Sequence, residues 1–140
     1  MRFHIDDRAT RYCDIFPEIG KGDINVVVYQ PGALAAWHRH QRQADYHFCV
    51  QGALKIGICN GPKNEWVDDT WCERWCKFHV LSDRNPCPPL KIEAGLWHGV
   101  YNFTTEPAIL IYHITNKYDG TDEERATVEE MRWDWKQEVK

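Results

Sequence analysis

The sequence lacks a long hydrophobic run and has no excess of basic residues. No stretch approaches the roughly 20 apolar residues of a membrane-spanning helix, and residues 1–16 carry charges where a secretory signal has its apolar segment. The formal net charge is −4, so no basic surface is expected for nucleic acid or an anionic membrane. The sequence therefore predicts a cytoplasmic protein that binds a small molecule.

Internal repeats, low-complexity tracts and linkers are also missing. With 140 residues, the chain is predicted to form a single domain over residues 1–140, large enough for a hydrophobic core. Six cysteines are present. Because cytoplasmic thiols are kept reduced, we expect free thiols or ligands rather than a disulfide framework.

Short β-rich runs bounded by Gly, Pro or Asn recur along the chain. They lie at 24–30, 46–50, 53–59, 90–92, 100–103 and 109–115. Short runs with these boundaries favour an all-β sandwich or barrel. The segment 60–89, rich in Trp, Cys and Pro, lacks this pattern and is interpreted as an excursion between the two halves of the barrel.

A helical pattern follows Gly120. Thr121 and Glu124 have the spacing of a capping box, and apolar residues then recur at helical spacing. These apolar residues are Val128, Met131, Trp135 and Val139. The pattern predicts an amphipathic helix over 121–139 that closes the barrel or contributes to a dimer contact.

Two histidines and an acid have a spacing that favours a shared site. His38 and His40 alternate, so on a strand they point to the same face, and Asp45 on the following strand can reach the same volume. His98, just after a tight turn, supplies a third imidazole. Three imidazoles and a carboxylate form a plausible site for iron, manganese, nickel or zinc.

These residues resemble the two motifs of the cupin superfamily. Gly32, His38, His40, Asp45 and Gly52 have the spacing of the first motif, and the second is represented by Gly95, His98 and Asn102. The departures are Asp45 where metal-binding cupins usually have Glu, and Glu93 where Pro is usual. The resemblance implies an all-β double-stranded β-helix (jelly-roll) barrel, here with a C-terminal helix.

Five blocks are similar to a narrower, RmlC-like group, the dTDP-4-dehydrorhamnose 3,5-epimerases. They are residues 37–40, 50–55, 81–85, 94–99 and 115–118. The resemblance implies that His38 is the base that removes a proton beside a sugar ketone. It implies that Tyr112 is the opposing acid, with His98 in the pocket. The family's enolate-stabilising lysine is replaced by Asp45. The related sugar 3,4-ketoisomerases also have a His-x-His pair here.

An epimerase of this kind needs contacts for a nucleotide diphosphate and no cofactor. Guanidinium groups suit phosphate, and aromatic rings can stack on a sugar or base. The candidates are Arg39, Arg42, Arg84, Trp37, Trp97 and Tyr118. The leading hypothesis is a homodimeric epimerase or isomerase acting on a dTDP-sugar. The alternatives are a metal-dependent cupin using His38, His40, Asp45 and His98, and a non-catalytic sugar-binding cupin.

Overall fold

The computed structural model describes residues 1–60, 75–131 and 133–136. The strands are β1 (Arg2–Ile5), β2 (Thr10–Cys13), β3 (Asp23–Tyr29), β4 (Leu34–His40), β5 (Asp45–Gln51), β6 (Ala53–Cys59), β7 (Cys76–Ser82), β8 (Leu90–Ile92), β9 (Trp97–Tyr101), β10 (Ala108–Ile114) and β11 (Glu123–Arg125). A 3-10 turn, η2 (Gly120–Asp122), and a helix, α2 (Val128–Met131), complete the described elements.

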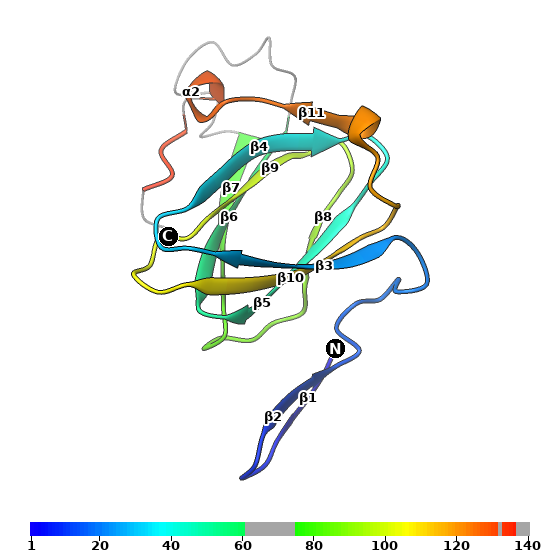
Figure 1. The fold of residues 1–140 in the computed structure, drawn as a ribbon, viewed down its shortest axis with the longest axis vertical. Coiled ribbons are helices and arrows are strands. Elements are labelled where there is room, and N and C mark those ends of the chain that lie inside the picture. Colours follow the sequence, from blue (N-terminus) through cyan, green and yellow to red (C-terminus); the bar gives the residue numbers. More distant parts are fainter. Residues whose placement is uncertain (61–74, 132, 137–140) are drawn as a thin grey trace.

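Two antiparallel sheets face each other and form the barrel (Figure 1). The four-stranded sheet has the order β3-β10-β5-β8, and the five-stranded sheet has the order β11-β4-β9-β6-β7. Because side chains alternate along each strand, one set from each sheet points inward. Leu54, Ile56, Val100 and Leu110, each at most 2% exposed, form the centre of the core between the sheets. The prediction of an all-β barrel is confirmed.

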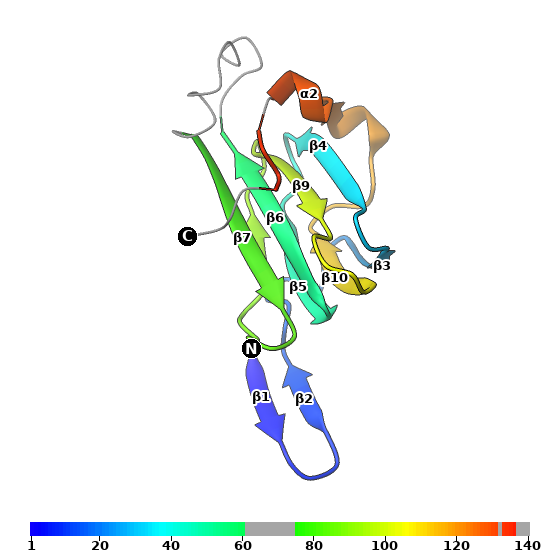
Figure 2. The ribbon, with the colours of Figure 1, turned by 90° about the vertical axis from the view of Figure 1, so that its left-hand side faces the viewer.

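The β1–β2 hairpin extends away from the barrel (Figures 1 and 2). Its contact with the barrel is aromatic, with the ring of Tyr12 packed edge-on against Phe48 at 5.3 Å between centroids. Phe48 lies on the outer face of the four-stranded sheet, where Phe16 and Tyr46 are also buried. The hairpin is therefore anchored at its base.

A bulge in β4 decides which side chains enter the barrel. The register of β4 with β9 shifts between Ala35 and His38, and an extra residue of this kind re-aims the side chains beyond it. Gly99 permits the bulge, since a Cβ there would lie 2.4 Å from Cβ of Ala36. Beyond the bulge, His38 faces the interior, and the Trp37 ring packs outside, on Trp133 and Trp135.

The predicted helix over 121–139 is wrong for the described residues. After η2 the chain continues as strand β11, which pairs with β4, and α2 comprises only Val128–Met131. The observed capping box begins at Thr127, whose hydroxyl accepts from the backbone NH of Glu130 while the Glu130 carboxylate accepts from the Thr127 NH. None of the helices described is long and apolar enough to cross a bilayer.

The end of the described chain packs on the outer face of the five-stranded sheet. The rings of Trp133 and Phe78 stack at 3.7 Å between centroids. The Lys55 ammonium donates to the carbonyl of Trp135 at 2.8 Å. Packing on this sheet, rather than a helix, therefore holds the C-terminal residues, which we call the C-terminal strap (residues 115–131 and 133–136).

The expectation of free thiols is wrong for one pair of cysteines. Cys59 and Cys76 are register partners on β6 and β7 and form a disulfide. Cys13, Cys49 and Cys87 are free. The predicted excursion lies mostly in 61–74, outside the described residues, and strand β7 occupies part of the remainder.

Candidate active site

The barrel encloses a cavity of about 560 Å³ between the two sheets. Inward-facing residues of β3, β5 and β10 line one wall, and β4, β9 and β11 line the other. The polar lining residues are Asp23, Asn25, Tyr29, His38, His40, Gln43, Asp45, His47, Tyr112, Tyr118, Glu123 and Arg125. The cavity therefore carries the imidazole, phenol and carboxylate groups of a chemical site.

Three histidines converge on the five-stranded side of the cavity. His38 and His40 alternate on β4, and His98 is the register partner of His38 on β9. Their candidate ligand nitrogens all lie within 4.8 Å of one another. The His98 Nδ1 lies 3.1 Å from the Leu96 carbonyl, which favours a proton on that nitrogen, and the buried Nε2 has no hydrogen-bond partner.

Asp45 lies beside this cluster and is held by several contacts. Its Oδ2 is 3.5 Å from Nε2 of both His47 and His98, and its Oδ1 accepts from the Gln43 amide at 2.8 Å. Burial opposes ionisation, but the contacts with His47 and His98 outweigh it and lower the pKa of Asp45 well below its usual range. Asp45 is therefore a carboxylate that orients imidazoles, and it is not one of the converging trio.

His38 and Tyr112 occupy opposite walls of the cavity. Burial, with the nearby His98 and His40, lowers the pKa of His38 to about 2, so its imidazole is neutral at ordinary pH. Burial, with the charge of Asp45, raises the pKa of Tyr112, which therefore keeps its phenolic proton. One wall thus offers a proton acceptor and the other a proton donor.

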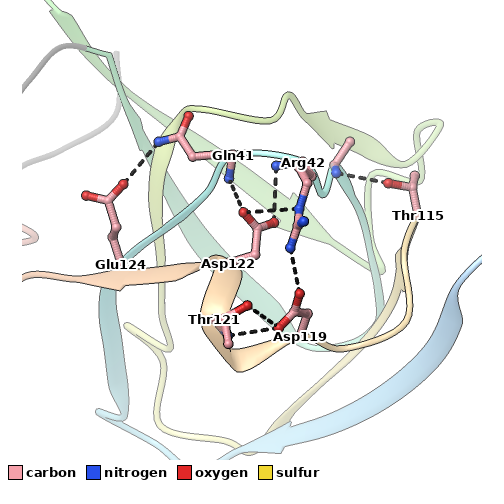
Figure 3. Close-up of polar contacts among 8 residues, drawn as sticks. Gln41, Arg42, Thr115, Asp119, Thr121, Asp122 and Glu124 are labelled. Atoms are coloured by element: carbon pink, nitrogen blue, oxygen red, sulfur yellow. Dashed lines mark hydrogen bonds and ion pairs between the residues drawn. The ribbon is translucent and has the colours of Figure 1, made fainter.

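The predicted phosphate-binding arginines have other partners. Arg39 pairs with Glu124 at 2.8 Å and stacks over the Trp97 ring. Figure 3 shows Arg42 against Asp119 and Asp122, which belong to the strap segment that follows β10. These pairs join β4 and the β4–β5 loop to the strap, and neither arginine is among the residues that line the cavity.

The remaining predicted substrate contacts do not all line the cavity. Arg84 lies in the loop after β7, away from the residues that line the cavity. Trp97 is fully buried, and Trp37, although it borders the cavity, is only 1% exposed. Tyr118 lines the cavity and is 66% exposed. Tyr118 is therefore the predicted aromatic contact whose ring is accessible to a ligand.

Sequence reasoning missed several residues of the lining. His47 was not singled out, although it shares a strand face with Asp45 two residues earlier. Asn25 and Tyr29 were not singled out, although they alternate with the apolar residues of β3. The signal that could have found all three is the two-residue period of their strands.

No protein-family model and no curated protein matches the sequence significantly. Solved structures do match the fold. A dTDP sugar isomerase from Desulfovibrio desulfuricans G20 is 17% identical with a TM-score of 0.75, covering 96% of this chain and 86% of its own. A dTDP-4-dehydrorhamnose 3,5-epimerase from Elizabethkingia anophelis is 20% identical with a TM-score of 0.72, covering 98% and 79%.

A third match is ChmJ, a 3'-monoepimerase from Streptomyces bikiniensis, in complex with dTDP-quinovose. It is 19% identical, with a TM-score of 0.76, and the match covers 99% of this chain and 74% of that one. Together with the two sheets and the inward-facing histidines, these matches define the fold as that of an RmlC-like cupin. At these identities, the similarity establishes the fold, and the reaction is argued from the cavity.

Proposed function

We propose that this protein is an epimerase or isomerase that acts on a nucleotide-linked keto sugar by moving a proton beside the ketone. The observation that carries the proposal is the placement of His38 and Tyr112 on opposite walls of one cavity. Inverting a carbon beside a carbonyl needs a base on one face of the sugar ring and an acid on the other. The similar structures, which are described as acting on or binding dTDP-sugars, support the substrate class.

The proposed reaction needs no oxidant and no group transfer. The neutral imidazole of His38 takes a proton from the carbon beside the ketone, and the electron pair of that C–H bond moves onto the ketone oxygen to form an enolate. Tyr112 then gives its phenolic proton to the opposite face of the carbon, and the ketone re-forms. Water finally returns the proton to Tyr112 and removes the one on His38.

The test is deuterium uptake from solvent. In D₂O, a dTDP-linked 4-keto-6-deoxyhexose incubated with the protein should gain deuterium beside the ketone, measured by mass spectrometry and NMR. His38→Ala should abolish uptake, whereas His4→Ala, at an exposed position on the hairpin, should leave it unchanged. Equal uptake in the His38→Ala and wild-type proteins would contradict the proposal.

The converging histidines favour a second candidate function, a metal-dependent cupin. Metals bind the neutral form of imidazole, the form assigned to His38, and the unpartnered Nε2 of buried His98 is suited to a ligand role. His38, His40 and His98 would hold a divalent ion such as Fe, Mn, Ni or Zn, and the Leu96 carbonyl at Nδ1 would orient His98. Such an ion would act as a Lewis acid on a substrate oxygen.

Elemental mass spectrometry of the purified protein, with and without chelator treatment, tests the metal candidate. Near-stoichiometric metal that is lost in His40→Ala but retained in His4→Ala would support it. A folded protein that takes up no metal after dialysis against each of the four ions would contradict it.

We also propose that the protein is a homodimer. Ile24, Val26 and Val28 on the outer face of edge strand β3 are 50%, 63% and 52% exposed, which forms an apolar stripe. Phe3 and Ile5 on the projecting hairpin are exposed as well. Contiguous apolar surface of this kind is typical of interfaces, and a two-fold pair of identical chains would bury the same stripe twice.

A further inference from the structure

Three tyrosines line the cavity, and Tyr112 is the one used in the proposed reaction. Tyr118 lies at the exposed rim, whereas Tyr29 on β3 and Tyr112 on β10 come from the inner face of the four-stranded sheet. The rings of both inner tyrosines pack against the core between the sheets. Two phenols therefore enter the cavity from one wall.

The backbone at Tyr29 is held by the side chain of Asn102. The fully buried Asn102 donates from its amide to the carbonyls of Tyr29 at 3.0 Å and Glu106 at 2.8 Å. The hydroxyl of Tyr29, in contrast, makes no hydrogen bond within the described part of the chain. A held ring with an uncommitted hydroxyl facing a cavity is suited to contact a ligand.

Two other donors of the lining are already engaged. The Gln43 amide donates to Asp45, and the Arg125 guanidinium donates to Glu123 at 2.9 Å. The Asp45 carboxylate would repel negative charge that develops on a substrate oxygen. Proton abstraction beside a ketone puts charge on that oxygen, so a donor aimed at it lowers the barrier.

We propose that the Tyr29 hydroxyl donates a hydrogen bond to the ketone oxygen as it becomes the enolate oxygen, while Tyr112 protonates the carbon. The inference rests on the proposed function and assigns Tyr29 as a further catalytic residue of the same site. No bond to Tyr29 forms or breaks, because its proton stays on the phenol oxygen throughout.

The environment keeps Tyr29 in the donor form. Burial, with the neighbouring Tyr112, raises the pKa of Tyr29 to about 12. The phenol is therefore protonated at every working pH, and its strength as a donor does not vary with pH.

The experiment compares Tyr29→Phe with the wild type in the deuterium-uptake assay on the dTDP-linked 4-keto-6-deoxyhexose. Tyr29→Phe should lower the rate constant at saturating substrate about 100-fold, the usual effect of losing one such donor. The affinity for dTDP, measured by calorimetry, should stay within about twofold. Tyr12→Phe, which removes a hydroxyl on the hairpin, should retain the wild-type rate.

Each outcome discriminates between the two proposals. Uptake in the wild type with an equal rate in Tyr29→Phe overturns the role of Tyr29 and leaves the proposed function standing. A rate loss matched by equal losses of dTDP affinity and thermal stability also overturns it, because that pattern belongs to a structural residue. Absence of uptake in the wild type overturns the proposed function and this inference together.

Discussion

His38 links the chemistry of the site to the stability of the protein. Burial holds the pKa of the folded-state imidazole at about 2, whereas an unfolded chain has a histidine pKa of about 6.5. Between these values the unfolded chain binds a proton that the folded chain does not. Stability is therefore lost as the pH falls below about 6.5, by about 1.4 kcal/mol per pH unit for one such group.

We predict that the free energy of unfolding of chelator-treated protein decreases from pH 6 to pH 4.5. The slope should be shallower in His38→Gln and unchanged in His4→Gln, which lies exposed on the hairpin. Asp45, whose folded pKa is depressed, adds a further loss only below about pH 4. Urea unfolding at each pH measures the slopes. Identical slopes in all three proteins would contradict the assignment of a neutral His38 in the folded protein.

At the scale of elements, the packing of the C-terminal strap depends on a glycine, Gly57, on the outer face of the five-stranded sheet. A Cβ on Gly57 would lie 2.6 Å from the Trp135 ring and 2.9 Å from the Trp37 ring. Glycine on β6 therefore lets the Trp135 and Trp37 rings approach the sheet closely. The strap also lines the cavity through Tyr118 and Arg125, so its anchoring on the outer face positions one side of the site.

We predict that Gly57→Ala destabilises the protein by about 1 to 3 kcal/mol, the usual cost of overpacking. The matched control is Gly20→Ala, since a Cβ at Gly20 meets nothing within 4 Å. Urea unfolding followed by tryptophan fluorescence reports both variants. Equal stabilities for the two variants would show that the strap does not pack as described.

The shared direction of His38 and His40 was predictable because alternate residues of a strand point to the same face. The spacing of His38 and His40 predicted a shared face, and the structure places both on β4 facing the cavity. The bulge at Ala36 and Trp37 was not predictable, because it depends on tertiary contacts with Gly99. The outward direction of the Trp37 ring follows from alternation with the inward-facing His38.

The predicted C-terminal helix failed for a related reason. Met131 and Trp135 have helical spacing, but Trp133 and Trp135 also have the two-residue spacing of extended chain. Packing against Phe78 and Trp37 decided between the two patterns. Helical propensity is a weak signal, and tertiary contacts override it where large aromatic areas are buried.

At the scale of the whole molecule, the apolar stripe on β3 makes a prediction about assembly. Sedimentation velocity should give a dimer for the wild type and a monomer for Val26→Glu, because a charge in the centre of the stripe would be desolvated on association. Val80→Glu, at another exposed valine on β7, should remain dimeric. A dimeric Val26→Glu protein would contradict the proposal that the stripe on β3 forms the dimer interface.

The most direct test of the two-wall reaction is the stereochemical outcome in Tyr112→Phe. With the donor removed, His38 can still remove the proton and return it to the same face of the ring. In D₂O the account therefore predicts that the dTDP-linked 4-keto-6-deoxyhexose gains deuterium with retained configuration, as resolved by NMR. Inversion at the wild-type rate in Tyr112→Phe would contradict the account.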